Sequence, residues 1–297
     1  MSTKPRRDTG REVTERIAAQ LEMGVAPWVR PWSAAPQRMP LNAHTSKPYR
    51  GANVLLLWSG AQAAGYDDPR WVTFRQAREL GGSVRRGERG TPVVFWRFVE
   101  RSKDVASAGQ GSEPDARRFA LCRTYTVFNV AQCEGLALAA PAAREGLESI
   151  DALVTRLGAE VRHGGERAVY FPSADRIQMP ALERFESREA YAATLLHELV
   201  HWTGHERRLA RTFGERFGDD AYAAEELVAE LGAAFLCAEL GVRGTLQHAE
   251  YLETWLRVLR ADRYALFTAA RHAQAAMERV LGSAEGEHED AGEASAD

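Results

Sequence analysis

Two histidines separated by three residues are the feature of this sequence with the clearest chemical meaning. They occur in the segment His197-Glu198-Leu199-Val200-His201. Successive residues of an α-helix are rotated by about 100°, so His197 and His201 project from one face, one turn apart, and can bind the same divalent ion. Glu198 is displaced sideways from this pair, where its carboxylate can act as a general base toward a water on the ion. With one further carboxylate ligand, a fourth zinc position stays open, so the segment predicts a catalytic zinc site suited to peptide hydrolysis.

The third ligand has to come from another part of the chain, and a helix predicted over residues 220–240 offers the best candidates. Glu226 and Glu230 lie on one stripe of this helix together with small residues, which allow a close approach to the histidine helix. We assign Glu226 as the third ligand and Glu230 as the acceptor for the outer N–H of a ligand histidine, an arrangement that resembles gluzincins. Glu230 is also an alternative third ligand, and so is Glu225, although Glu225 falls on the side of the helix predicted to face solvent. Imidazole and carboxylate ligands suit both Zn²⁺ and Mn²⁺; we assign Zn²⁺, with Mn²⁺ as the alternative.

The histidine segment is short enough to arise by chance, in which case Glu198 is a solvated charge. Here apolar residues surround it, and Ser187 is a suitable cap for a helix that ends near Gly204. Around this helix the sequence predicts a small antiparallel sheet and further helices. The predicted strands are 159–162, 169–171 and 176–179, and the predicted helices are 145–158, 220–240 and one or two within 247–282.

The first half of the chain predicts a different mixture of elements. Thr9-x-x-Glu12 and Thr73-x-x-Gln76 have the spacing of capping boxes, and Asn53 is a candidate cap for a helix ending near residue 65. Strands are predicted over 91–99 and 118–130, and the Ser- and Gly-rich segment between them is expected to be a loop.

Charge is distributed unevenly between the two halves. Residues 1–140 hold 21 Lys and Arg against 13 Asp and Glu, a net charge of +8, whereas residues 141–297 hold 17 against 28, a net charge of −11. Uneven surface charge without any partner is the plain explanation. A basic half of this size also favours an anionic partner such as nucleic acid.

Aromatic residues strengthen the nucleic-acid interpretation of the basic half. Five of the seven tryptophans precede residue 100 and are interleaved with arginines. Single-stranded nucleic acid binds to aromatic faces, on which bases stack, and to cations along its phosphates. Taken singly, tryptophans such as Trp58 and Trp96 are more often part of a hydrophobic core, whereas Trp28 and Trp32, in an extended segment bounded by prolines, are better candidates for stacking. The residues that we assign to single-stranded DNA are Trp28, Arg30, Trp32, Tyr49, Arg50, Arg85, Arg86 and Arg89.

The order of motifs resembles one known family along residues 10–280. Segments 27–32, 49–58, 71–76 and 82–90 resemble the N-terminal domain of ArdC-type antirestriction proteins, which is itself similar to the N-terminal region of TraC primases. Segments 196–205 and 222–230 resemble the zincin-like metallopeptidase domain that follows in that family. The resemblance implies a single-stranded-DNA-binding domain, a Spartan/SprT-like metallopeptidase domain, and a role in protecting the incoming DNA of mobile elements. It also implies His197, His201 and Glu226 as metal ligands and Glu198 as general base.

The fold class that we predict is α+β with two domains. The predicted divisions are an N-terminal domain at 8–135, a linker at 136–144, the zincin-like domain at 145–282 and a disordered acidic tail at 283–297. Three cysteines without a paired spacing indicate a reducing compartment, and neither a secretory signal nor a membrane span is recognisable. We therefore expect a cytoplasmic protein without a membrane partner.

These features predict an antirestriction protein that binds single-stranded DNA and hydrolyses peptide bonds with a metal-activated water. Tethering a peptidase to DNA raises its effective concentration near other DNA-bound proteins, so host proteins on DNA are the predicted substrates. The main alternative is a non-proteolytic protein that coats single strands and whose metal site is structural or vestigial. A metal-dependent nuclease is a second alternative, although nucleases usually gather several carboxylates around paired ions.

Overall fold

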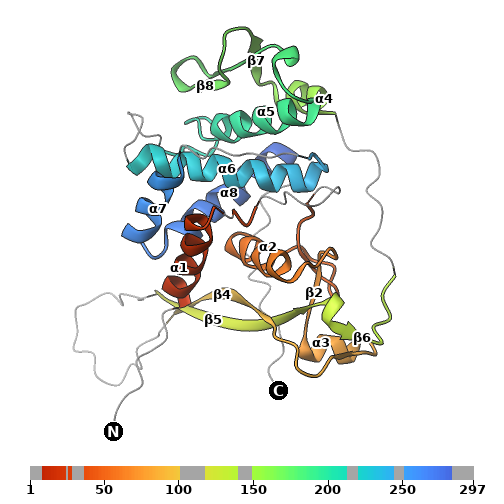
Figure 1. Ribbon diagram of the computed structural model, residues 1–297. Helices are drawn as coiled ribbons and strands as arrows, with labels where there is room; N and C mark the ends of the chain where they lie inside the picture. The colour runs from red at the N-terminus through yellow and green to blue at the C-terminus, as the bar shows by residue number, and fades with distance from the viewer. Residues whose placement is uncertain are drawn as a thin grey trace, which may run out of the picture.

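A computed structural model describes most of the chain (Figure 1). The described residues are 9–24, 26–28, 37–100, 118–139, 149–212, 220–243 and 251–282. Arg30, Trp32, the loop at 103–116, most of the predicted linker and the predicted acidic tail lie outside them.

The first half of the chain contains both helices and strands, and helices dominate the second half. The helices are α1 (Thr9–Glu22), α2 (Ala52–Ala64), α3 (Phe74–Glu79), α4 (Ile150–Leu157), α5 (Arg188–Thr203), α6 (Asp220–Leu240), α7 (Leu252–Ala261) and α8 (Ala265–Leu281). The strands are β1 (Leu41–Asn42), β2 (Arg70–Thr73), β3 (Ser83–Val84), β4 (Thr91–Glu100), β5 (Arg118–Asn129), β6 (Cys133–Glu134), β7 (Glu160–His163), β8 (Val169–Phe171) and β9 (Arg176–Met179). The predicted helices and strands are confirmed within the described residues.

The N-terminal domain is built on a four-stranded sheet with the order β1-β2-β5-β4. β1 runs parallel to β2, whereas β2 and β4 both run antiparallel to β5. The capping box predicted at Thr73 and Gln76 is present at the start of α3. Asn53, in contrast, does not cap α2; its side-chain amide exchanges two hydrogen bonds with the backbone of Val94 on β4. The residue before α2 is Gly51, which adopts a φ of 57° and needs no side-chain cap.

The small sheet of the second domain corrects one prediction. Its order is β7-β9-β8, and β7 pairs parallel to β9, so the sheet is mixed rather than antiparallel. The physical reason lies in the connection after β8. The chain turns back from β8 into β9, which makes these two strands antiparallel, and β7 then occupies the free edge of β9 in the same direction.

The protein has the predicted two-domain α+β architecture, and the domains share hydrophobic packing. One cluster of buried side chains continues from α1 and α2 through α5 and α6 to α8. Figure 1 shows α2 between the β4–β5 sheet and the helices α6 and α8, and shows α1 beside α7. At this junction Gly51 N–H donates to Gln274 Oε1 at 3.3 Å, and Arg50 pairs with Glu278. The exact domain boundaries stay a prediction.

No helix within the described ranges is both long enough and apolar enough to cross a membrane.

Candidate metal centre and nucleic-acid interface

Helix α5 presents both histidines toward the protein interior. Ser187 caps the helix by accepting a hydrogen bond from the Ala190 backbone N–H at 3.0 Å, as the sequence predicts. The side chains of His197, Glu198 and His201 are all buried. Buried imidazoles and carboxylates need partners, and helix α6 supplies them.

Helix α6 approaches α5 closely because a glycine lies at the contact. A Cβ atom at Gly232 would lie only 2.8 Å from Val200 Cγ2 on α5, so a side chain there would push the helices apart. The sequence prediction placed Glu225 on a solvent-facing side of α6, and this is wrong. The helix is buried continuously from Glu225 to Ala238, so its middle section has no solvent side.

His197, His201 and Glu226 bring their ligand atoms together in a triangle. The two Nε2 atoms are 3.2 Å apart, and Glu226 places Oε2 at 3.5 Å from His197 Nε2 and Oε1 at 3.5 Å from His201 Nε2. Tetrahedral ligands at zinc-like bond lengths are separated from one another by about 3.4 Å. Within the described part of the chain, these three residues form the group that could hold a metal ion, and the spacing of their ligand atoms fits a zinc-sized cation.

The outer nitrogen of each histidine faces a different carboxylate. Glu225 Oε1 lies 3.2 Å from His201 Nδ1, and Glu230 Oε2 lies 3.8 Å from His197 Nδ1. A carboxylate on Nδ1 favours the tautomer whose Nε2 lone pair is available to a metal. The carboxylate beside His201 was not predicted for this role. Glu230, which was assigned as an outer acceptor, lies on the Nδ1 side of His197, but at 3.8 Å the contact is longer than a hydrogen bond, so its role stays a prediction.

Arg211 completes the surroundings of His201, and nothing in its local sequence marks it out. Its guanidinium donates to both oxygens of Glu225, with Nη2 to Oε1 at 2.8 Å and Nε to Oε2 at 3.0 Å. It also donates to Thr203 Oγ1 and to the carbonyl of Val200 near the end of α5. Because Arg211 and Glu225 are both buried, each compensates the desolvated charge of the other.

The pKa values in this cluster follow from burial and from the opposed charges. Burial by itself lowers the pKa of His201, but the hydrogen bond with Glu225 and the charge of Glu226 raise it to about 9. Burial raises the pKa of Glu226, but the hydrogen bond with His197 and the charges of both histidines lower it to about 2. The carboxylates of the cluster therefore stay negatively charged and stabilise a positive charge among them.

Tyr222 lies one helical turn before Glu226 and contacts it. Its hydroxyl hydrogen-bonds Glu226 and lies 3.4 Å from the hydroxyl of Tyr251. Burial, Tyr251 and Glu226 together raise the pKa of Tyr222, so the hydroxyl keeps its proton and can donate it in a hydrogen bond. The spacing of four residues from Glu226 was a signal that could have identified Tyr222 from the sequence.

Two aromatic residues assigned to DNA are buried, which corrects those assignments. The indole of Trp28 is only 4% exposed and packs edge-on against Trp255, with ring centroids 6.2 Å apart. Tyr49 is also buried, within the smaller apolar cluster that contains Trp71. Neither ring offers a face on which a base could stack. Arg50 is exposed, but it forms its ion pair with Glu278 on α8.

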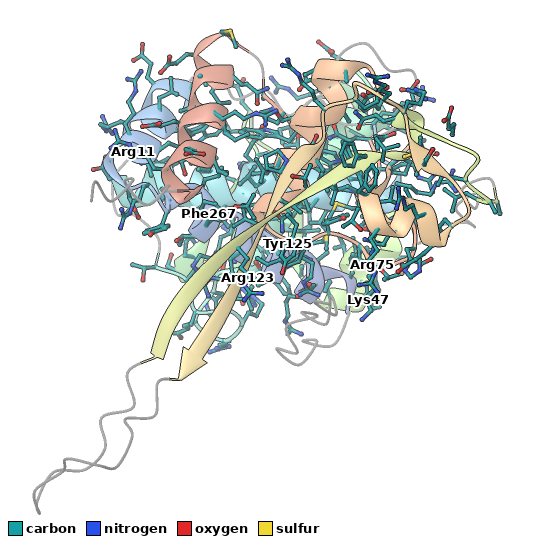
Figure 2. The ribbon with its side chains drawn as sticks, turned by 90° about the horizontal axis from the view of Figure 1, so that it is seen from below. Arg11, Lys47, Arg75, Arg123, Tyr125 and Phe267 are labelled. Carbon is teal, nitrogen blue, oxygen red and sulfur yellow. The ribbon has the colours of Figure 1, made fainter. Side chains whose placement is uncertain are left out.

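The arginines near residue 87 have the exposure that a phosphate contact requires. Arg85, Arg86 and Arg89 are all exposed, and Arg85 pairs with Glu88 at 2.8 Å. Further exposed cations, Lys47, Arg75 and Arg123, belong to the same domain and are seen from below in Figure 2.

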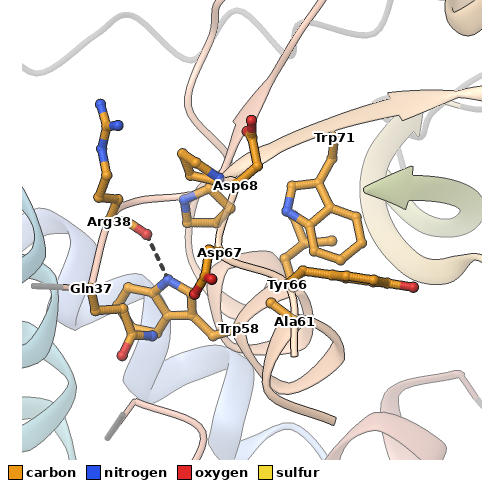
Figure 3. A pocket seen from close by; sticks show the side chains of 11 residues that line it. Gln37, Arg38, Trp58, Ala61, Tyr66, Asp67, Asp68 and Trp71 are labelled. Atoms are coloured by element: carbon orange, nitrogen blue, oxygen red, sulfur yellow. Dashed lines mark hydrogen bonds between the residues drawn. The ribbon is translucent and has the colours of Figure 1, made fainter. Parts of the chain in front are cut away.

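The N-terminal domain also has a pocket, and none of the metal ligands lines it. It is lined by residues of the 37–71 region, including Trp58, whose indole N–H donates to the Arg38 carbonyl at 2.9 Å (Figure 3). Asp67 and Asp68 line it as well. These two acidic side chains disfavour a phosphate there, so the pocket is not part of the candidate nucleic-acid interface.

Comparison with known proteins agrees with this two-part organisation. Residues 7–128 match the family model described as the N-terminal domain of anti-restriction factor ArdC, and residues 148–272 match that of a zincin-like metallopeptidase. The crystal structure of the antirestriction ArdC protein from plasmid R388, in its metal-free form, superposes with a TM-score of 0.78 at 40% identity. That comparison covers 93% of this chain and 97% of the other. The chain belongs to the ArdC family.

Other members and relatives extend this comparison. The Mn(II)-bound structure of the R388 ArdC protein has a TM-score of 0.75 at 38% identity and covers 95% of this chain and all of the other. The protein y4eC of Sinorhizobium fredii is 42% identical over 278 residues, which are 90% of this chain and 89% of that protein. The DNA primase TraC of Escherichia coli is 38% identical over 289 residues; the match covers 91% of this chain but 27% of the primase.

Proposed function

We propose that this ArdC-family chain is an antirestriction protein that binds single-stranded DNA and hydrolyses peptide bonds with a metal-dependent site. The observation that carries the proposal is the triangle of His197, His201 and Glu226. Glu198, which follows the ligand His197 in the sequence, is buried as well. This arrangement combines three ligand atoms at zinc-like separations with one carboxylate that is not needed for binding the ion.

In this proposal His197, His201 and Glu226 hold Zn²⁺, with Mn²⁺ as the alternative. When bound, such an ion supplies a Lewis acid for a carbonyl and a nucleophile at neutral pH. The Mn(II)-bound structure of the R388 relative supports a divalent ion in this family. Mixed imidazole and carboxylate ligands are compatible with both metals.

The remaining residues act on protons and on the orientation of the ligands. Glu198 accepts a proton during attack on the peptide carbonyl and returns it to the leaving amine. Glu225 and Glu230 orient His201 and His197 from their Nδ1 sides, and Tyr222 orients Glu226 by donating to it.

The DNA-binding part of the proposal rests on the ArdC N-terminal domain and its exposed cations. The exposure of Arg85, Arg86 and Arg89 supports a contact of their guanidinium groups with phosphates. Arg30 and Trp32 stay predictions outside the described residues. Proteins bound to the same DNA are the proposed substrates, since tethering raises the local concentration of the peptidase.

A paired measurement on the wild type and on Glu198→Gln tests this function. Bound metal per chain is determined by elemental analysis, and cleavage of an unfolded casein is followed with and without a single-stranded oligonucleotide. We expect about one ion per chain in both proteins and cleavage by the wild type alone, increased by the oligonucleotide. Equal cleavage by both proteins contradicts the role of Glu198.

A second candidate function is a DNA-shielding protein with a structural metal site. The low exposure of all three ligand side chains favours it, because a protein substrate reaches a buried site less easily than an exposed one. In the same experiment this candidate predicts bound metal and bound DNA in both proteins, and cleavage by neither.

A further inference from the structure

A residue of the N-terminal domain reaches the surroundings of the metal cluster. Trp28 precedes the metal-binding helices by more than 150 positions, yet its Nε1–H donates to Glu230 Oε1 on α6 at 3.3 Å. The other oxygen of the same carboxylate lies 3.8 Å from Nδ1 of His197. Trp28 and Glu230 are 4% and 1% exposed, so water does not substitute for this contact.

Glu230 matters because each oxygen of its carboxylate has a different neighbour. A buried carboxylate is held by the donors around it, and loss of a donor lets it rotate or leaves an oxygen unsatisfied. One oxygen accepts the indole N–H, and the second lies on the side of His197 Nδ1, at an ion-pair distance that is longer than a hydrogen bond. Carboxylates outside a ligand histidine fix the orientation of its ring and its tautomer.

A row of aromatic rings links Trp28 to the third ligand as well. Trp28 packs against Trp255, which stacks on Tyr251 with ring centroids 6.1 Å apart. The hydroxyl of Tyr251 lies 3.4 Å from that of Tyr222, which hydrogen-bonds Glu226. The tryptophan of the N-terminal domain therefore lies at the end of two chains of contacts, one to His197 and one to Glu226.

We propose that Trp28 is a positioning residue of the metal centre, by which the ArdC N-terminal domain orients His197 through Glu230. The inference rests on the proposed metal site. It replaces the assignment of Trp28 to base stacking and makes the metal centre dependent on the junction of the two domains. Because coupling between sites is reciprocal, an ion in the centre also stabilises the placement of Trp28.

The test compares the same substitution at two neighbouring tryptophans of the full-length protein. Trp28→Phe removes the indole N–H that binds Glu230, whereas Trp255→Phe makes the same change at the neighbouring ring, whose Nε1 has no hydrogen-bond partner among the described residues. The dissociation constant for Zn²⁺ is measured by competition with a chromophoric chelator. We expect Trp28→Phe to weaken binding by about tenfold, the lower end of the effect of outer partners, and Trp255→Phe to change it far less.

A double-mutant cycle shows whether the effect passes through Glu230. In a Glu230→Gln background, Trp28→Phe should weaken Zn²⁺ binding no further. Should Trp28→Phe fail to fold, β-(3-benzothienyl)alanine at position 28 keeps the ring volume and removes the N–H.

Each outcome has a definite meaning. Equal losses of affinity in Trp28→Phe and Trp255→Phe, or no loss in either, overturn the role of Trp28 and leave the metal site standing. A full additional loss in the Glu230→Gln background overturns the route through Glu230. A wild-type protein that binds no Zn²⁺ overturns the proposed metal site, and the inference with it.

Discussion

The charges of the metal cluster are buried, whereas those of the exposed arginines Arg85, Arg86 and Arg89, which we call the basic face of the N-terminal domain, are in contact with solvent. Glu225, Glu226 and Glu230 are at most 6% exposed, and buried cationic or donor groups surround them. Arg85 and Arg86, in contrast, are exposed. Buried charges interact strongly with fixed partners, while exposed charges are screened by salt and contribute little one at a time. Single substitutions should therefore have large effects in the first region and small, cumulative effects in the second.

The largest effect is expected from removing the third ligand. Glu226→Gln eliminates the negative charge that faces both histidines, so Zn²⁺ affinity should fall by more than the roughly 100-fold that marks the loss of an outer partner. Chelator competition measures it, with Glu253→Gln as a control at an exposed position of α7. An unchanged affinity in Glu226→Gln would mean that another residue completes the site.

The buried pair of Arg211 and Glu225 provides the next test. Arg211→Met leaves the Glu225 carboxylate buried without its guanidinium, which should lower the free energy of unfolding by about 3–5 kcal/mol. Urea denaturation of the metal-free protein measures this loss. Adding Glu225→Gln should restore part of the stability, because the uncompensated charge is removed. A loss below about 1 kcal/mol would mean that this pair contributes no more than an exposed ion pair does.

The close contact between α5 and α6 should respond to one added methyl group. Gly232→Ala places a Cβ against Val200, and overpacking of this kind costs about 1–3 kcal/mol. The same change in a Val200→Ala background should cost much less, since the opposing methyl groups are gone. If Gly232→Ala lowers the stability equally in both backgrounds, the loss does not come from a clash with Val200.

The pH dependence of the metal-free protein sharpens the comparison further. The pKa of His201 is raised from 6.5 to about 9, so its contribution to stability is fully present below pH 6.5 and is lost as pH rises through 9. The denaturation midpoint of the wild type should fall across this range relative to His201→Gln. Zn²⁺ affinity should rise over the same interval, because binding displaces the proton. Parallel pH profiles for the two proteins would contradict this assignment.

The smallest single effects are expected on the basic face. Arg86→Ala should weaken binding of a single-stranded oligonucleotide modestly and reduce the slope of log K against log[salt] by about 0.7 per phosphate contact. Adding Arg85→Ala and Arg89→Ala should make the losses accumulate. Fluorescence anisotropy at several salt concentrations measures the slope, and Arg162→Ala in the second domain is the control. An unchanged slope in the triple variant would place the DNA surface elsewhere.

The sequence by itself determined the features that depend on spacing within one element. Four residues along a helix always bring two side chains to one face, so His197 and His201 were predictable as a pair, as was the helix that Ser187 caps. Strands β4 and β5 were likewise visible from their local composition. The motif order also predicted the ArdC family and the two-domain α+β fold, both of which are confirmed.

Only the tertiary structure decided which partner each of these side chains meets. Arg211 and Glu225 are 14 positions apart, and Trp28 and Glu230 are 202 apart, so no local pattern brings either pair together. Helical periodicity fixes the angle of Glu225 around the axis of α6, but not what lies on that side. Because the middle of α6 is buried on every side, Glu225, which the sequence pattern sends to solvent, meets His201 on α5 and Arg211 instead.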